Sequence, residues 1–305
     1  MLDTSRPFAR VRTTWEVAIA ALVVALSACG GGLESPTGVT TNPNPPTNNT
    51  PAAFPGFDTS IYPGDAAMTA WRHPTSPYYW AGYYLPAPCH RDITWMSKYS
   101  TLTAMGWGLA ALYVGQQDWT QIPQTVVVRG ARETARAAES TPSEKALARQ
   151  LVVCSASLLS ADQGTAEAAD AVVKLKADGF PDGSIVFLDV EYVSFVTAPL
   201  LEYYRAWITG ILKDGHYKPG IYAAKFNATT LRVAALDAYK AAGSTADPPF
   251  WIASSSGFSL SQTPTAVGLD YAKLWQGGYD LTQTYGGVTL FIDANVAAMK
   301  SPSAP

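Results

Sequence analysis

The chain has 305 residues, of which 48% are hydrophobic and 15% are charged, and its formal net charge is -3. This composition can bury a sizeable core and carries no basic excess that would favour nucleic-acid binding. It also argues against disorder for most of the chain, because disordered segments are poor in hydrophobic residues.

Residues 1–28 predict an export signal. Three arginines precede an apolar run over residues 17–26. The run is too short for a permanent membrane span and is typical of a secretory signal peptide.

The end of this run, Leu-Ser-Ala-Cys at residues 26–29, resembles the lipobox of bacterial lipoproteins. The resemblance implies that Cys29 becomes the lipid-modified first residue of the mature chain. Gly30 stands where inner-membrane lipoproteins usually carry Asp, which implies the outer membrane. An ordinary signal peptide cleaved after Ala28 is the alternative.

Residues 29–53 predict a flexible tether, because Pro, Thr, Asn and Gly replace large apolar side chains there. At ~3.1 Å per residue, such a segment reaches at most roughly 70 Å. We expect it to connect a membrane anchor to a folded domain over residues 54–300, and we expect residues 301–305 to form a disordered tail.

Short apolar runs in the rest of the chain predict eight strands. The run over residues 184–190 is rich in β-branched and large apolar side chains, as in a strand buried on both faces. The predicted strands cover residues 54–58, 79–85, 107–114, 184–190, 219–223, 249–253, 272–276 and 289–293.

Helical patterns separate several of these strands, at residues 92–105, 166–177, 199–214 and 229–242. The alternation favours a single α/β domain folded as a (β/α)8 TIM-like barrel, whose site lies at the C-terminal ends of its strands. An open doubly wound sheet is the alternative, but no glycine-rich phosphate loop follows the first strand. We interpret residues 116–161 as an insertion that shapes one wall of the cleft.

Acidic residues stand at the ends of three predicted strands. Asp189 and Glu191 share one face of their strand, about 7 Å apart along it. Asp58 ends the first predicted strand and Asp293 the last. If the barrel closes, these four carboxylates face one cavity.

Six short segments resemble, in order, the lysozyme-type muramidases of glycoside hydrolase family 25. They more closely resemble the exported bacterial glycoside-hydrolase-like domains related to those muramidases. The segments are Gly-x-Asp-x-Ser at 56–60, Asp-Val-Glu at 189–191, Pro-Gly-Ile-Tyr at 219–222, Phe-Trp-Ile-Ala at 250–253, Leu-Trp-Gln at 274–276 and Ile-Asp-x-Asn at 292–295.

The resemblance implies a role for each acid. Glu191 matches the proton donor, and Asp189 matches the acid that stabilises or orients the reacting N-acetyl sugar. Asp58 and Asp293 match supporting carboxylates. Glycoside hydrolysis needs one carboxyl group that keeps its proton near neutral pH, and crowded like charges raise at least one pKa.

Other residues at matching strand ends are candidates for binding the sugar. They are Tyr222, Trp251, Trp275 and Gln276, with Tyr62 and Tyr192 as weaker candidates just past strand ends. Each tryptophan can equally well fill the core of a barrel.

The remaining cysteines and histidines carry no metal motif. Cys89 and Cys154 either form a disulfide or stay as two buried thiols. The three histidines are dispersed, so we expect neither a metal nor an organic cofactor.

The sequence therefore predicts a lipid-anchored glycoside hydrolase of the bacterial cell envelope. Its expected partner is a polysaccharide, peptidoglycan or another amino-sugar polymer, and it would touch the membrane only through its lipid. The alternative is a catalytically inactive glycan- or cell-wall-binding lipoprotein on the same barrel, because a fold alone does not establish activity.

Overall fold

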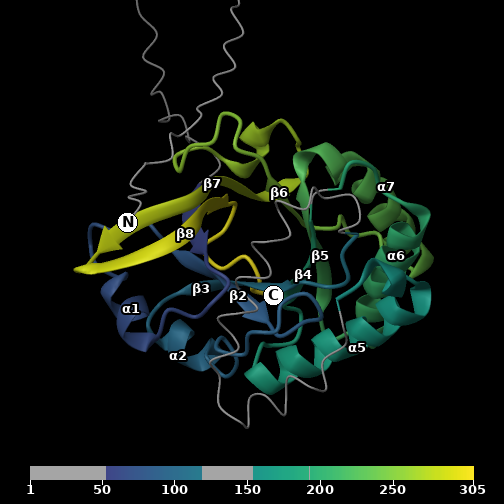
Figure 1. Cartoon of the computed structure of the whole chain (residues 1–305), viewed down its shortest axis with the longest axis horizontal. Coiled ribbons are helices and arrows are strands. Elements are labelled where there is room, and N and C mark those ends of the chain that lie inside the picture. The colour runs from purple at the N-terminus through teal and green to yellow at the C-terminus, as the bar shows by residue number, and fades with distance from the viewer. Residues whose placement is uncertain (1–52, 119–153, 192) are drawn as a thin grey trace, which may run out of the picture. The chain divides into compact units, whose positions relative to one another are not determined.

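The computed structural model describes residues 53–118, 154–191 and 193–305, and within them eight strands close into a barrel (Figure 1). The predicted TIM-like barrel is therefore confirmed. Its strands are β1 (Phe54–Asp58), β2 (Trp80–Leu85), β3 (Gly108–Tyr113), β4 (Ile185–Val190), β5 (Lys218–Ala224), β6 (Phe250–Ala253), β7 (Ala272–Tyr285) and β8 (Val288–Ala297).

Helices lie outside the ring of strands, with the three long ones along the right of Figure 1. They are α1 (Asp65–Ala70), α2 (Tyr99–Ala104), α5 (Ala161–Asp178), α6 (Ala198–Asp214) and α7 (Lys225–Ala241), with short 3-10 helices η3 (Ala156–Leu158) and η4 (Pro264–Val267). The Thr197 hydroxyl caps α6 by accepting from the Leu200 amide, and Gly215 ends that helix in the left-handed conformation. The predicted helix over 92–105 shortens to α2.

The direction of the last strand differs from the prediction. β1 to β7 pair in parallel with their neighbours, but β8 runs antiparallel to both β1 and β7. β7 continues for 14 residues and turns back at Gly286 and Gly287, both of which have positive φ. A Gly-Gly turn of this kind makes a β-hairpin, so no helix separates β7 from β8.

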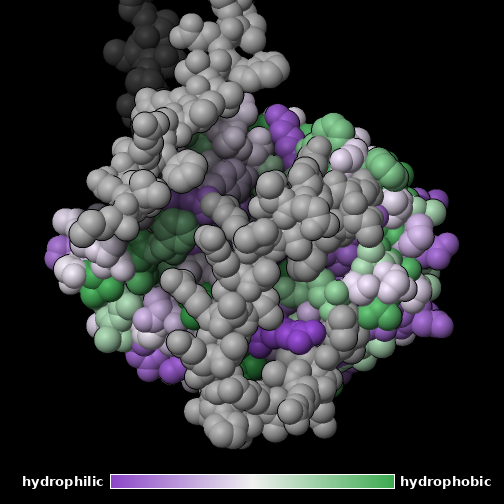
Figure 2. Space-filling view, in the orientation of Figure 1, coloured by the Kyte–Doolittle hydropathy of each residue, from purple (hydrophilic) through white to green (hydrophobic). Residues whose placement is uncertain are grey.

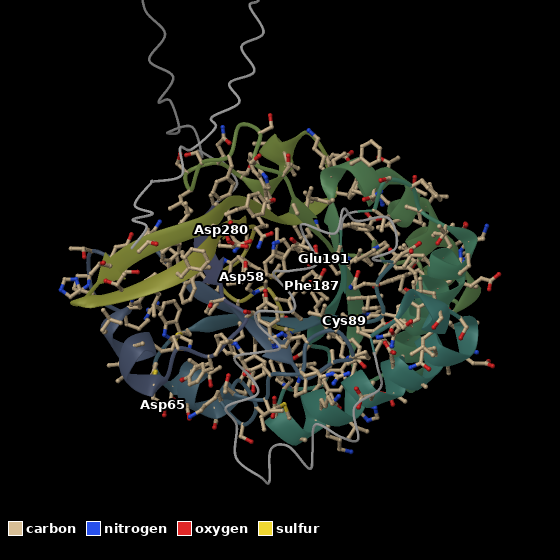
Figure 3. The ribbon with its side chains drawn as sticks, viewed as in Figure 1. Asp58, Asp65, Cys89, Phe187, Glu191 and Asp280 are labelled. Atoms are coloured by element: carbon tan, nitrogen blue, oxygen red, sulfur yellow. A yellow bond between two sulfur atoms is a disulfide. The ribbon has the colours of Figure 1, made fainter. Side chains whose placement is uncertain are left out.

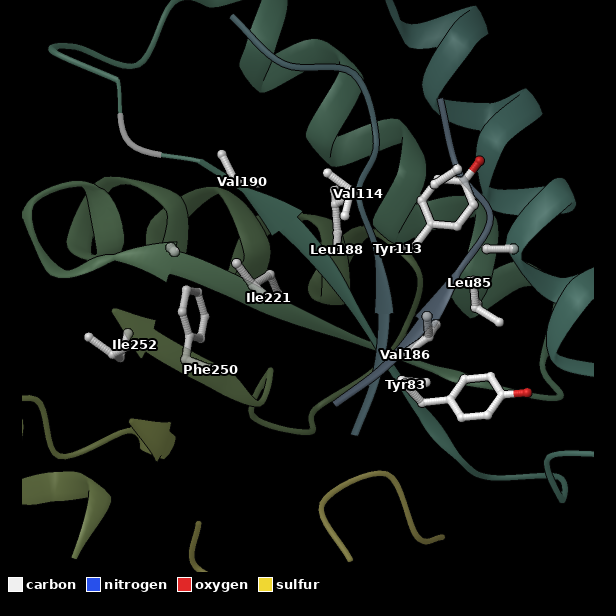
Figure 4. Close-up of a cluster of buried hydrophobic side chains, with 14 of the residues drawn as sticks. Tyr83, Leu85, Tyr113, Val114, Val186, Leu188, Val190, Ile221, Phe250 and Ile252 are labelled. Atoms are coloured by element: carbon white, nitrogen blue, oxygen red, sulfur yellow. The ribbon is translucent and has the colours of Figure 1, made fainter. Parts of the chain in front are cut away.

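Side chains alternate between the barrel interior and the layer under the helices. Outward-facing residues such as Val186, Ile221 and Phe250 form part of the main hydrophobic core, shown in Figure 4. The interior holds a second, smaller cluster made of Trp80, Ala110, Leu112, Phe187, Trp251, Leu274 and Ala297. The ring centroids of Trp80 and Trp251 lie 5.4 Å apart in an edge-to-face arrangement.

Glycine makes room for these interior rings. A Cβ atom at Gly56 would lie 2.1 Å from the indole of Trp80, and one at Gly220 would lie 2.6 Å from the ring of Phe187. Protein interiors pack as densely as organic crystals, so there is no room for a side chain at Gly56 beside Trp80 or at Gly220 beside Phe187.

The sulfurs of Cys89 and Cys154 are bonded, with their Cα atoms 4.9 Å apart. Of the two arrangements that the sequence left open, the structure has the disulfide. The bond joins the segment after β2 to the segment before η3 across 65 residues of sequence.

The C-terminal residues differ from the predicted disordered tail. The backbone of Ser303 donates to Leu109 O at 2.8 Å and accepts from the Ile185 amide at 3.0 Å. Its hydroxyl accepts from the Ala111 amide at 2.8 Å. These bonds fix the tail against the starts of β3 and β4, because backbone groups that β3 and β4 leave unpaired there need partners.

The outer face of the long helices mixes hydrophilic and hydrophobic residues (Figure 2). In the described part of the chain, no helix combines the length and the hydropathy that crossing a membrane requires. The signal peptide, Cys29 and most of the tether, like most of the 116–161 insertion, lie outside the described residues, and those assignments remain predictions.

Replacing Gly56 by Ala should destabilise the domain by about 1–3 kcal/mol, because the added methyl group forces Trp80 out of its place in the interior. Urea unfolding followed by tryptophan fluorescence measures the change. Gly243→Asn is a suitable control, since that position is left-handed, open to solvent and tolerant of Asn. Equal stability of Gly56→Ala and the wild type would contradict the described interior packing.

Replacing both Cys89 and Cys154 by Ser should lower the free energy of unfolding by roughly 2–4 kcal/mol, because the unfolded chain loses a long covalent loop. The same loss is expected when the wild-type protein is unfolded with a reductant present. Two free thiols in the unreduced protein, measured by thiol titration, would show that the bond is absent.

Candidate active site

The four predicted acids meet at one mouth of the barrel. Asp58 and Asp189 lie at the C-terminal ends of β1 and β4, two residues beyond the interior-facing Gly56 and Phe187. The register places Asp293 opposite Asp58. They share a cavity of about 80 Å³ that is lined by Asp58, Tyr84, Leu112, Asp189, Glu191, Tyr222, Trp251, Gln276 and Asp293.

Figure 3 shows Asp58 and Glu191 on the inner side of the ring of strands, near Phe187, and Asp65 at the periphery beside α1. Asp293 reaches the cavity by a route that differs from the prediction. Asp293 lies in the middle of β8 and not at its C-terminal end. Because β8 runs antiparallel to β1, its C-terminal end points away from this mouth of the barrel.

Asp58 is held by three hydrogen bonds. Its Oδ1 accepts from the Tyr84 hydroxyl at 2.8 Å. Its Oδ2 accepts from Gln276 Nε2 at 2.8 Å and from Asn295 Nδ2 at 2.7 Å. Burial raises the pKa of Asp58, and the three donors act in the opposite direction because they favour the charged form.

Asp189 is buried beside Asp58 without comparable support. Its Oδ1 has no hydrogen-bond partner. Burial raises the pKa of Asp189 well above its usual range, and the charges of Glu191 and Asp58 raise it further. Of these two buried acids, Asp189 therefore keeps its proton more firmly.

Glu191 follows directly after β4 and is exposed to solvent. Its backbone amide donates to Gln117 Oε1 at 3.1 Å, and Gln117 Nε2 donates to the carbonyl oxygen of Asp189 at 2.7 Å. One buried glutamine side chain therefore fixes the backbone on both sides of the two acids. Gln117 stands at the start of the segment that the sequence presented only as an insertion.

A bulge in β7 supports Asp293. Oδ1 of Asp293 accepts a hydrogen bond from the backbone amide of Asp280 at 2.7 Å, and Asp280 has a positive φ of 55°. The same bulge carries Tyr279, whose hydroxyl donates to the Gln276 carbonyl at 3.3 Å. Burial raises the pKa of Tyr279, and the charges of Asp293, Asp58 and Glu191 raise it further.

An aromatic and amide layer forms the wall and floor of the cavity. The hydroxyl of Tyr222 donates to Gln276 Oε1 at 2.5 Å. Its ring centroid lies 5.5 Å from that of Trp251, and Trp251 Nε1 donates to Asn295 Oδ1 at 3.0 Å. Gln276 and Asn295 each link the aromatic wall to Asp58.

Two predicted binding residues lie elsewhere. Trp275 faces the helix side of β7, where its Nε1 donates to Ser254 O at 2.7 Å. Tyr62 is buried, and its hydroxyl donates to Asp65 Oδ1 at 2.5 Å. Neither lines the cavity, and Tyr192 lies outside the described residues.

Three residues of the site, Tyr84, Asn295 and Gln117, were not predicted from the sequence. Two of them could have been found. Tyr84 follows Gly82 by two residues along β2, and Asn295 follows Asp293 by two residues along β8. Residues two apart in a strand lie on the same face, so Tyr84 and Asn295 face the barrel interior. Nothing in the sequence connects Gln117 with β4, because that contact spans 72 residues.

His90 packs against Tyr84, one of the residues that line the cavity. Its ring centroid is 4.9 Å from that of Tyr84, and its Nε2 has no hydrogen-bond partner. Burial lowers the pKa of His90 to about 4, so the ring is neutral at physiological pH. Among the residues that the structure describes, no group of three or more His, Cys, Asp or Glu side chains is arranged to hold a metal ion.

The arrangement combines two kinds of carboxyl group over one small cavity. One kind is buried and charge-coupled, and the other, Glu191, is open to solvent. Such a pair can deliver a proton to a bound molecule and can stabilise positive charge that develops on it.

Several solved structures are similar to this chain at low sequence identity. An uncharacterized B. stearothermophilus protein is 14% identical with a TM-score of 0.48, and the match covers 80% of this chain and 95% of that one. The Mycobacterium tuberculosis Tat-secreted protein Rv2525c is 16% identical with a TM-score of 0.46, covering 81% and 95%. The Clostridium perfringens spore cortex lytic enzyme SleM is 12% identical with a TM-score of 0.46, covering 83% and 69%.

No curated protein matches the chain. The family model described as "Rv2525c-like, glycoside hydrolase-like domain" matches residues 69–297, which is more than half of the sequence. The matched segment contains three of the four clustered acids and all strands from β2 to β8. The chain therefore belongs to the family of Rv2525c-like, glycoside hydrolase-like domains.

Proposed function

We propose that this glycoside hydrolase-like domain hydrolyses glycosidic bonds in an amino-sugar polymer such as peptidoglycan. The observation that carries the proposal is the shared cavity, in which the exposed Glu191 stands beside the buried, charge-coupled Asp189. A glycosidase needs this division between a proton donor that meets the substrate and a group that supports the reacting sugar.

Glu191 is the proposed acid. Its carboxyl O–H bond breaks as the proton passes to the glycosidic oxygen, and the bond between that oxygen and the sugar C1 breaks in the same stage. A water molecule then adds its hydroxyl group to C1 and returns its second proton to Glu191. A glycan that covers Glu191 excludes solvent and helps the carboxyl group to keep its proton until the bond breaks.

Asp189 is the proposed orienting group. With its proton retained, its carboxyl group can donate a hydrogen bond, and its unpartnered Oδ1 is available to a polar group of the sugar. The carbonyl oxygen of an N-acetyl substituent can accept the hydrogen bond that Asp189 donates.

Asp58 and Asp293 are proposed to support the floor of the cavity. The three donors to Asp58 hold its carboxylate in place, and Gln276 connects it to Asp293 and to Tyr222. Asp58 then supplies a fixed negative charge beneath the reacting sugar.

The proposed setting is the bacterial cell envelope. The predicted signal peptide, lipidated Cys29 and tether would place the barrel outside the inner membrane, within reach of the cell wall. Peptidoglycan is the amino-sugar polymer that such a location offers.

A second candidate function is glycan binding without hydrolysis. It is favoured by the small volume of the cavity, about 80 Å³, which is below the usual range for a site that encloses a small molecule. On this reading the acids hold a glycan on the surface and no bond is broken.

Digestion of purified peptidoglycan by the full chain should release reducing ends. Glu191→Gln and Asp189→Asn should each lower that rate by roughly 10²- to 10⁴-fold, because a positioned acid contributes that much to catalysis. Glu202→Gln on the exposed face of α6 is the matched control and should retain full activity.

A sedimentation assay with insoluble peptidoglycan separates the two candidate functions. Retention of the wild-type protein on the pellet without release of reducing ends would favour the binding protein. Turnover that neither Glu191→Gln nor Asp189→Asn changes would contradict the proposed catalytic roles.

Asp189→Asn should stabilise the protein increasingly as the pH rises. The folded-state pKa of Asp189 lies well above that of an aspartate in the unfolded chain, so the stabilising contribution of Asp189 is complete below about pH 4. That contribution is lost at higher pH, where the folded state must give up the proton. Asn stays neutral and avoids that loss.

Urea unfolding of both proteins from pH 3.5 to pH 8 checks this. The stability difference should be small at pH 3.5 and should grow by about 1.4 kcal/mol for each unit by which the folded pKa is raised. A difference that stays constant over this range would show that Asp189 titrates normally.

A further inference from the structure

The acid cavity accommodates only part of a sugar. Its volume of about 80 Å³ contrasts with the roughly 300–1,000 Å³ of pockets that enclose whole small molecules. Most of any bound glycan must therefore lie across the surface around the cavity mouth, and the residues on that surface decide how much of the chain is recognised.

Two phenylalanines are exposed on segments that follow the strands of this mouth. Phe195 lies in the connection from β4 to α6 and is 62% exposed, and Phe226 lies in the first turn of α7 and is 69% exposed. Both follow the C-terminal ends of neighbouring parallel strands, β4 and β5, which carry the cavity residues Asp189 and Tyr222.

The segments that carry these rings are fastened together. The buried side chain of Asn227 donates from Nδ2 to the carbonyl of Val193 at 3.0 Å and accepts from the Val193 amide at 3.4 Å. Val193 is two residues beyond Glu191, and Asn227 directly follows Phe226. The two phenylalanines therefore flank one double hydrogen bond on the Glu191 side of the cavity.

This pairing differs from the exposed apolar residues on the outer faces of the long helices. Val173, Val233 and Leu236 stand on the outer faces of α5 and α7, where single apolar residues are common and need no explanation. Phe195 and Phe226 instead expose large flat rings on segments that directly follow two strands of the polar cavity, and the buried amide of Asn227 fastens those segments together. Flat apolar rings next to polar groups suit the apolar face of a sugar.

We infer that Phe195 and Phe226 form a stacking subsite for a sugar unit on the Glu191 side of the cavity, so that the protein recognises an extended glycan chain and not a single terminal sugar. The inference rests on the proposed function, since it takes the ligand to be a glycan. It adds to that function a preference for long glycan chains and names the two residues that determine this preference.

The test measures affinity against chain length. The full-length chain carrying Glu191→Gln, which prevents turnover, is titrated calorimetrically with β-1,4-linked N-acetylglucosamine oligomers of about two to six units and with soluble peptidoglycan strands. Phe195→Ala, Phe226→Ala and their combination are compared in the same background. Tyr79→Ala is the matched control, because Tyr79 is an exposed aromatic just before β2, at the opposite end of the barrel.

Affinity should rise with chain length in the parent protein and in the Tyr79→Ala control. Each phenylalanine variant should lose roughly 2- to 10-fold for the long oligomers, the range expected for an aromatic contact, and nothing for the shortest. Unchanged affinity for long chains, or an equal loss at every length, would overturn the subsite while the proposed function stands. If neither the parent nor the wild-type protein binds any of these glycans, the proposed function fails and the subsite fails with it.

Discussion

The site depends on the electrostatic cost of burying several carboxylates together. Water would normally solvate these charges, but the barrel mouth removes it from Asp58 and Asp189 and brings Glu191 close to them. Three hydrogen bonds offset the cost for Asp58. Asp189 lacks that compensation on Oδ1, so burial and the neighbouring charges raise its pKa further. The difference between two identical side chains therefore comes from their surroundings.

The barrel supplies those surroundings through alternation. An interior side chain recurs every second residue, so the aromatic cluster around Trp80 and Trp251 lies one layer below the acids and closes the barrel beneath them. The antiparallel β8 contributes to the same layer, because its register brings Asp293 opposite Asp58 although the strand runs the other way. Gln117 then holds the backbone of the two acids on β4 from a different part of the chain.

The sequence was sufficient for the fold class and for the gathering of the four acids, because β4 and β1 are short, apolar and end in carboxylates. Its errors have identifiable physical causes. The Gly286-Gly287 turn signals a hairpin, and overlooking it gave β8 the wrong direction. Trp275 and Gln276 are adjacent and cannot both face the interior, so alternation alone would have excluded one of them. Gln117 and the fixed C-terminal tail depend on contacts between distant segments, which local patterns do not encode.

The most direct test of this account is a titration of the aspartate carboxyl carbons by NMR, with ¹³C-labelled Asp and the resonance of Asp189 identified by its loss in Asp189→Asn. The account predicts that Asp189 titrates well above the usual aspartate range and that Glu191→Gln lowers its pKa, because one neighbouring charge is removed. An Asp189 resonance that titrates near pH 4 and does not respond to Glu191→Gln would contradict the shared, charge-coupled cavity.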